Sequence, residues 1–583
     1  MRYLWILLLI LSCADRAYKT DVKEISVAEL VDYFWEYELR EYPMFATQVG
    51  VNTYNDQLGS FKEEDFQRRG AVYDSLLQVL DGWNSQDLSP EDRLEYELIR
   101  YHLSDLSAEV NFKRYQIPLL ADAGFHISFA FLPSSTPFKT KQDYYNYLRR
   151  LNQFPEYVQQ HIELMRAGLA EGMTQPQVIF EGYEVTYRAH IVEDVTKSQF
   201  FKPFLELQLG LSPSDSLDLL TQATSAVKHV IQGYSNFSAF MKEEYVPRTR
   251  ISLGASELPE GQAYYQQRIQ HFTTLSLNAQ EIHDIGLQEV ARIKGEMQEI
   301  IDEVGFEGDL QAFINYLRSD PKFYAREAQE LLHYAAYLSK KADAALPKLF
   351  GKLPRQPYGV APVPEHLAPK YTGGRYISAD IHSTLPGYYW VNTYNLSSRP
   401  LYVLPALTLH EAVPGHHLQS ALTQELEGFS AFRKNLYISA FGEGWGLYCE
   451  FLGQEMDIYE DPYANFGRLT YEMWRACRLV VDTGIHAFGW TRDQVRDYML
   501  QHTALSYHEI TTETDRYISW PGQALAYKMG ELKIKELRKL CEQQMGEDFD
   551  IRVFHDLILS QGTVTLPILE NMVNEYLKEN TTN

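Results

Sequence analysis

HEAVPGHHLQ, at residues 410–419, is the stretch from which the interpretation of this chain begins. A zinc hydrolase needs two or three His or carboxylate ligands, an open position for water and a carboxylate that serves as the base. The familiar helical pattern is His-Glu-x-x-His, in which both histidines share one helix face and the Glu points at the water. His410 and Glu411 begin this pattern, but Pro414 occupies the position of the second histidine.

The spacing to the next histidines excludes a straight helix. At about 100° per residue, His416 would lie about 240° around the helix from His410. His417 returns to the right face, but about 10.5 Å further along the axis. Because Pro414 cannot continue a regular helix and Gly415 tolerates unusual torsions, we expect a bulged helix whose expanded turn returns His416 to His410. His417 is the alternative ligand.

A second stretch, FGEGWGLYCE at residues 441–450, supplies carboxylates for the same site. Glu443 and Glu450 lie on one face of the predicted helix. We therefore predict Glu443 as the third zinc ligand, with Glu450 as the partner that orients a ligating histidine. Glu411 is the predicted general base.

Most of the chain has the periodicity of helices, and a mainly α fold is expected. Six prolines between Pro347 and Pro369 predict that the helix before them stops at Pro347 and that an extended connection follows. Gly387–Thr393 has the aromatic and β-branched character of a strand. The expected helices are residues 27–50, 91–110, 141–168, 214–245, 278–304 and 326–346.

The first residues resemble a lipoprotein signal peptide. Residues 1–12 combine a minimal basic start with an apolar run too short to cross a bilayer, and Cys13 follows as the expected lipidation site. Residues 13–25 are then expected to form a linker, and residues 26–583 a single large helical domain. The alternative is two lobes that meet near residue 350, with the metal site in the C-terminal lobe. The expected location is the bacterial cell envelope, through a lipid anchor; the alternative is secretion as a soluble protein.

Charge and cysteine content exclude several classes. The formal net charge is −25 and no basic stripe is present, so nucleic-acid binding is not expected. Beyond Cys13 only Cys449, Cys477 and Cys541 remain, and none forms a Cys-x-x-Cys pair. Neither a disulfide framework nor a thiolate metal site is expected.

Several motifs together resemble the bacterial domain-of-unknown-function 885 family over about residues 24–580. The resemblance implies a mostly helical fold similar to the deep-cleft zinc peptidases, which include thermostable carboxypeptidases, oligopeptidases and angiotensin-converting enzyme. In that group a small antiparallel sheet flanks the cleft and its edge strand aligns the peptide, a role expected here for Gly387–Thr393. The motifs lie at residues 137–138, 147–151, 410–419, 443–448, 482–490 and 516–530.

Further candidates follow from what peptide hydrolysis requires. A donor must stabilise the oxyanion, and an exopeptidase needs a cation for the substrate carboxylate. The candidate oxyanion donors are Tyr527, His486 and Tyr517. The candidate substrate-binding residues are Arg516, Lys528, Arg475, Arg478 and Tyr517.

The predicted function is zinc-dependent hydrolysis of short peptides. One alternative is a zinc hydrolase of another amide, such as an acyl-amino acid or a cell-wall fragment. The other is a non-catalytic lipoprotein that binds peptides on a degenerate scaffold. Retention of Glu411 favours catalysis, because metal binding alone requires no base. No oligomeric state is predicted.

Overall fold

The computed structural model describes residues 25–205, 207, 210–365, 368, 371–379 and 386–581. The predicted signal peptide and Cys13 lie outside these residues. The chain forms two compact units: Met1–Ser252 with Glu257–Gly261 and Ser430–Asn435, and Leu253–Ser256 with Gln262–Phe429 and Leu436–Asn583. The candidate metal ligands all belong to the second unit. The proline-rich stretch near residue 350, the position of the alternative lobe boundary, also lies within the second unit.

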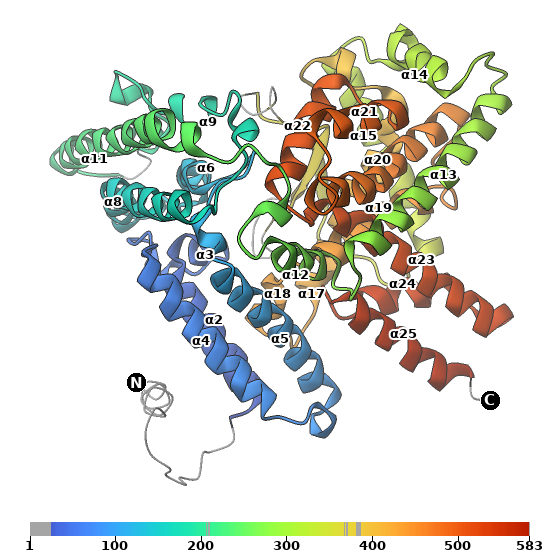
Figure 1. The fold of residues 1–583 in the computed structure, drawn as a ribbon, viewed down its shortest axis with the longest axis horizontal. Coiled ribbons are helices and arrows are strands. Elements are labelled where there is room, and N and C mark those ends of the chain that lie inside the picture. The colour runs from blue at the N-terminus through green and yellow to red at the C-terminus, as the bar shows by residue number, and fades with distance from the viewer. Residues whose placement is uncertain are drawn as a thin grey trace. The chain divides into compact units, whose positions relative to one another are not determined.

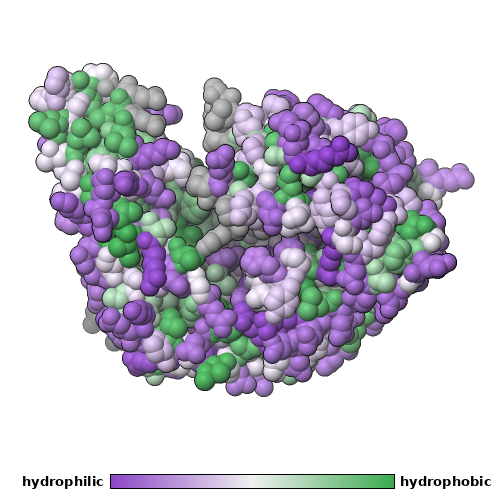
Figure 2. Space-filling view, turned by 90° about the horizontal axis from the view of Figure 1, so that it is seen from above, coloured by the Kyte–Doolittle hydropathy of each residue, from purple (hydrophilic) through white to green (hydrophobic). Residues whose placement is uncertain are grey.

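The fold class is the expected one: helices account for 70% of the residues and strands for only 4%. No helix in the described part of the chain is long and apolar enough to cross a membrane. Hydrophilic side chains cover much of the face drawn in Figure 2, with hydrophobic ones in separate groups. Cys449, Cys477 and Cys541 are free and buried, so the described part of the chain contains no disulfide, as expected.

In the first unit, α8 (Lys141–Glu171) and α11 (Pro213–Phe240) pack side by side (Figure 1). Aromatic rings fill the space around them; Phe129 and Phe154, for example, stack with their centroids 3.9 Å apart. The other helices of this unit are α2 (Val27–Glu41), α3 (Pro43–Gln48), α4 (Glu63–Asp81), α5 (Pro90–Asn111), α6 (Phe125–Ala130), α7 (Leu132–Ser135), α9 (Val185–Arg188), α10 (Lys202–Leu205) and α18 (Ala431–Asn435).

The second unit is built on two helix pairs: α13 (Ala279–Glu303) packs against α20 (Pro462–His486), and α19 (Ser439–Leu452) against α23 (Ala526–Met545). The expected capping box of Asn278 and Glu281 starts α13. The remaining helices are α12 (Gly261–Thr273), α14 (Leu310–Ser319), α15 (Ala328–Leu349), α16 (Leu404–Glu411), α17 (His416–Glu425), α21 (Arg492–His502), α22 (Tyr507–Ser519), α24 (Ile551–Leu559) and α25 (Leu566–Thr581).

One small sheet accompanies these helices, and it differs from expectation in two ways. Its strand order is β1 (Tyr358–Pro362), β3 (Gly387–Val391), β2 (Gly374–Ile377). β3 pairs parallel with β1 and antiparallel with β2, so the sheet is mixed, not purely antiparallel. The predicted strand exists as β3 but is central, so the expectation that it forms an edge is wrong. The edge strand that contacts α16 is β2.

The helix α15 continues through Pro347 to Leu349, so the prediction that it stops at this proline is wrong. In the last turn of a helix, proline removes only one backbone donor. The N–H of Phe350 still donates to the carbonyl of Leu346 and ends the helix. The extended connection predicted beyond this point contains β1.

Candidate metal centre

The segment between His410 and His416 separates two helices. His410 lies in the last turn of α16, and His416 is the first residue of α17. The intervening residues include a cis peptide bond between Val413 and Pro414. The predicted bulge within one helix is wrong: α16 ends at Glu411 and α17 starts at His416, and this break in the helix brings His416 beside His410.

Gly415 makes this return possible. A Cβ at Gly415 would lie 1.9 Å from the carbonyl oxygen of His410 and 2.4 Å from that of Leu409. Only a residue without a side chain can pass the end of α16 this closely. The buried Trp445 of α19 holds the connection, because its indole Nε1–H donates to the carbonyl of Pro414 at 2.9 Å.

His410, His416 and Glu443 converge, and we call these three residues the candidate metal centre. Their donor atoms all lie within 4.8 Å of one another. The Nε2 atoms of His410 and His416 are each 3.5 Å from Glu443 Oε2. Donors about 2.0–2.2 Å from one ion in tetrahedral geometry are about 3.3–3.6 Å apart. The donor set and these two spacings therefore fit a zinc ion.

Small residues on α19 bring Glu443 to the histidines. A Cβ at Gly446 would lie 2.7 Å from Cε1 of His410, so the imidazole packs directly on the helix backbone. A Cβ at Gly444 would lie 2.5 Å from Cα of Gly530 on α23. Alternate glycines thus allow α19 to approach both α16 and α23.

Glu450 orients His410. Its Oε1 is 2.8 Å from Nδ1 of His410, and both side chains are buried. This partner assigns the proton to Nδ1 and leaves Nε2 facing Glu443. Burial lowers the pKa of His410, but hydrogen bonds with Glu443 and Glu450 outweigh it and raise the pKa to about 10. The surrounding carboxylates thus stabilise a positive charge where a metal ion would supply one.

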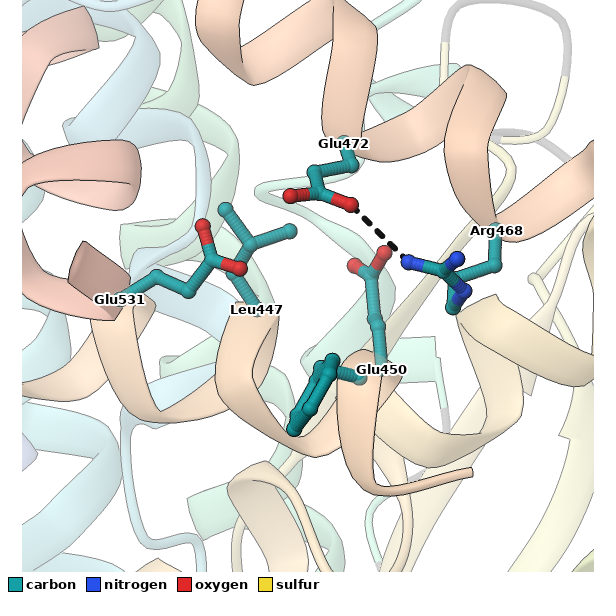
Figure 3. Close-up of a pocket in the computed structure, with 6 residues that line it drawn as sticks. Leu447, Glu450, Arg468, Glu472 and Glu531 are labelled. Atoms are coloured by element: carbon teal, nitrogen blue, oxygen red, sulfur yellow. Dashed lines mark hydrogen bonds and ion pairs between the residues drawn. The ribbon is translucent and has the colours of Figure 1, made fainter. Parts of the chain in front are cut away.

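Glu450 shares a small pocket with other charged side chains. Figure 3 shows the carboxylates of Glu450, Glu472 and Glu531 and the guanidinium of Arg468 pointing toward one another around a small pocket. Arg468 pairs with Glu472 at 2.9 Å. This arrangement belongs to the packing of α19, α20 and α23, and the cation that approaches Glu450 itself is Arg475, at 3.7 Å.

Glu411 lies next to the candidate centre, and the sheet fixes its orientation. It is the last residue of α16, and its Oε2 accepts a hydrogen bond of 2.8 Å from the backbone N–H of Tyr376 on β2. Sequence inspection missed this contact because the four-residue strand β2 has no clear pattern. The carboxylate is acceptor-only when ionised, which suits a base.

His417, the alternative ligand, faces away from the centre. Its Nδ1 is 3.0 Å from the hydroxyl of Tyr376, and its ring lies 4.6 Å from that of Tyr358. Burial lowers the pKa of His417 to about 4, so it is a neutral core histidine. The structure therefore groups His416, not His417, with His410.

Two of the proposed oxyanion donors are occupied elsewhere. His486 is fully buried; its Nδ1 accepts from the N–H of Ala255 and its Nε2 lies 2.9 Å from the carbonyl of Tyr517. The hydroxyl of Tyr517 accepts from Trp474 and Arg478, each at 2.9 Å. These contacts join α20 to α22 and to Ala255, and the roles of His486 and Tyr517 as oxyanion donors stay predictions.

The proposed substrate cations are also engaged within the protein. Lys528 is completely buried, with its ammonium group 2.5–2.9 Å from three glutamates. Arg478 is buried and pairs with Glu513 at 3.0 Å. Arg475 lies against the Trp474 ring, 3.7 Å from Glu450, and Arg516 donates to Gln523 at 2.8 Å. All four cations thus have partners within the protein, and their assignment to a substrate carboxylate stays a prediction.

Tyr527 keeps its place among the candidates. The guanidinium of Arg478 lies 4.5 Å from its ring centroid, and Arg516 approaches its hydroxyl at 3.5 Å. Its predicted role as an oxyanion donor stays a prediction.

Tyr437 is a residue that the sequence did not single out. Its hydroxyl donates to Oε1 of Glu443 at 2.9 Å, while the other oxygen of Glu443 faces the histidines. A Cβ at Gly442 would lie 2.6 Å from the Tyr437 ring. Because glycine has no side chain, the ring can pack directly against α19. The side chain is nevertheless 57% exposed. Nothing in a tyrosine six residues before a glutamate indicates this role.

Replacing Tyr437 with phenylalanine is expected to weaken zinc binding by about 10- to 100-fold, because partners that orient a metal ligand typically contribute this much. The ring and its packing on Gly442 stay, so the unfolding temperature of the metal-free protein should change little. Competition with a chelator measures the affinity, and Tyr394→Phe at another exposed tyrosine is the control. An unchanged zinc affinity would remove Tyr437 from the site.

The fold and the site together define a mainly helical protein with a His, His, Glu cluster in its C-terminal half. The chain belongs to the family described as "Bacterial protein of unknown function (DUF885)", which it matches over residues 43–573. No curated protein matches the chain.

Two solved structures are similar over nearly the whole length. A candidate lipoprotein from Colwellia psychrerythraea is 28% identical, with a TM-score of 0.88, 95% of this chain covered and 100% of that one. A candidate lipoprotein of unknown function from Shewanella oneidensis is 18% identical, with a TM-score of 0.74 and coverage of 94% and 100%; this second likeness concerns the fold alone.

Proposed function

We propose that the chain is a zinc-dependent hydrolase that cleaves peptide bonds in short peptides. The observation that carries this proposal is the convergence of His410, His416 and Glu443 next to the carboxylate of Glu411. Two imidazoles and one carboxylate leave a fourth position open, which is typical of catalytic and not of structural zinc sites.

The roles of the residues follow from their positions. A bound zinc ion would activate water and polarise the scissile carbonyl. Glu411, held by the N–H of Tyr376, would accept a proton from the attacking water and pass it to the leaving amine. Glu450 would keep the Nε2 of His410 directed at the centre. Tyr527 is the candidate donor to the developing oxyanion.

Peptide as the substrate rests on the resemblance to zinc peptidases. The edge strand β2 lies beside the proposed base, because its Tyr376 N–H donates to Glu411. We also propose that Cys13 carries a lipid anchor in the cell envelope. The two structural relatives, both described as candidate lipoproteins, support this location.

The purified protein is expected to contain one zinc ion per chain and to cleave short peptides. Metal content by mass spectrometry and a peptide screen read by product mass test this. A chelator should abolish cleavage and added zinc restore it, because Glu411 alone cannot activate water sufficiently. His410→Ala should lose the metal, and His333→Ala, at an exposed histidine of α15, should keep it.

Absence of stoichiometric zinc would overturn the proposal and favour a peptide-binding protein. Zinc binding with cleavage of acyl-amino acids or cell-wall fragments, but not of peptides, would retain the metal hydrolase and replace its substrate.

A further inference from the structure

Arg475 is a buried cation on α20 that lies close to Glu450, the partner of His410. Its Nη2 is 3.7 Å from Oε1 of Glu450, and the same oxygen is 2.8 Å from Nδ1 of His410. Glu450 and His410 are buried as well. Three side chains from α20, α19 and α16 thus form a chain of contacts that ends at a proposed metal ligand.

The helix that carries Arg475 also fixes the position of its guanidinium. The guanidinium carbon lies 4.5 Å from the ring centroid of Trp474 and 4.7 Å from that of Tyr471. Its Nη1 donates to the carbonyl of Tyr471 at 3.3 Å. A guanidinium that stacks on aromatic faces in this way is held more firmly than an ammonium would be. The cation beside Glu450 is therefore set in place by its own neighbours on α20.

Among the described residues, no other lysine or arginine pairs with Glu450. Arg468, across the small pocket, pairs with Glu472 at 2.9 Å (Figure 3), and Lys528 pairs with the same carboxylate at 2.8 Å. Oε2 of Glu450 is buried in this pocket and accepts no hydrogen bond from the described part of the chain. Because a buried carboxylate needs a compensating charge, Glu450 depends on Arg475 for it.

We propose that Arg475 is a positioning residue: its charge holds the carboxylate of Glu450 against His410 and so keeps the imidazole directed at zinc. This inference rests on the proposed function, because it concerns the same metal centre. The partner of a ligating histidine fixes the tautomer and the direction of the ring. Without Arg475 the attraction that keeps Glu450 on the side of His410 is lost. Zinc then binds more weakly, although all three proposed ligands remain.

Zinc affinity, measured by competition with a chelator, tests this role without catalysis. Glu450→Gln should lower the affinity by about 10- to 100-fold. Arg475→Gln should lower it by about 3- to 30-fold, the usual size of an effect that passes through an intervening residue. In the double variant the loss should not exceed that of Glu450→Gln alone, because Arg475 acts only through Glu450.

Two further variants separate positioning from general damage. Arg475→Lys keeps the charge but not the planar stacking, and it should restore part of the affinity. Arg468→Gln is the matched control, because it removes a buried arginine from the same helix that does not pair with Glu450; its zinc affinity should equal that of the parent. The visible spectrum of the cobalt-substituted protein should change in Arg475→Gln and not in Arg468→Gln, a difference that a purely structural role would not produce.

A crystal structure of the metal-free Arg475→Gln protein gives a readout that needs neither zinc nor hydrolysis. The contact of 2.8 Å between Glu450 and His410 should lengthen beyond hydrogen-bond distance. Retention of this contact would overturn the proposal.

An unchanged zinc affinity, or losses that add up in the double variant, would also overturn it. So would a higher KM for peptides with a free C-terminus at parental zinc affinity, which would favour the predicted contact of Arg475 with the substrate. The two proposals fail separately. An Arg475-dependent zinc affinity in a protein that cleaves no peptide would refute the hydrolase and keep the positioning role. If the chain bound no zinc, the hydrolase would fail, and the crystal structure would decide whether Arg475 positions Glu450.

Discussion

Replacing Glu411 with glutamine is expected to lower kcat/KM for peptide cleavage by about 10²- to 10⁴-fold, the usual contribution of a general base. Glutamine has nearly the same shape and can still accept the N–H of Tyr376 through its carbonyl oxygen. It cannot take a proton from water. Steady-state kinetics of the zinc-loaded proteins measure the loss.

The metal content separates a lost base from a damaged site. Glu411→Gln should bind zinc as the parent does, because Glu411 is not a ligand in the proposed centre. Glu427→Gln, at an exposed glutamate beyond α17, should retain full activity. A Glu411→Gln protein with parental kcat/KM would refute the base role, and the water would then need another acceptor.

Replacing Gly415 with alanine is expected to abolish stoichiometric zinc binding and to destabilise the fold by more than about 3 kcal/mol. Overpacking in a well-packed core typically costs 1–3 kcal/mol, and here the added methyl would meet two backbone carbonyls that cannot rotate away. The start of α17 must shift, and His416 shifts with it. Metal analysis and chemical denaturation give the two quantities.

Gly295 offers the matched substitution. It is an exposed residue well inside the ends of α13, and a Cβ added there would have no neighbour within 4 Å. Gly295→Ala should keep the zinc and stabilise the helix by about 0.5–1 kcal/mol. If Gly415→Ala retained both its zinc and its stability, the connection between α16 and α17 would have to be looser than the structure indicates.

The long helices were predictable because each repeats its apolar residues over several turns. The segments of α8, α11 and α13 were found in this way, with the capping box of α13. β3 was found from its aromatic and β-branched residues. Its neighbour β2 was missed, because four residues that begin with glycine are too few to show a helical or a strand repeat. This strand forms because it pairs with β3.

The sequence by itself determined the candidate residues of the site. His410, Glu411, Glu443 and Glu450 are polar groups in otherwise apolar segments, and the proline and glycine between the histidines exclude a straight helix. These are local properties, set by residue type and by the 3.6-residue helical repeat.

Only the tertiary structure decided which of these residues meet. It brought His416 rather than His417 to His410, placed Tyr376 on Glu411 and Tyr437 on Glu443, and buried Lys528 and His486 among partners within the protein. Such choices depend on close approaches between α16, α19, α23 and β2. Side-chain volumes on separate segments set those approaches, and no pattern within one segment encodes them.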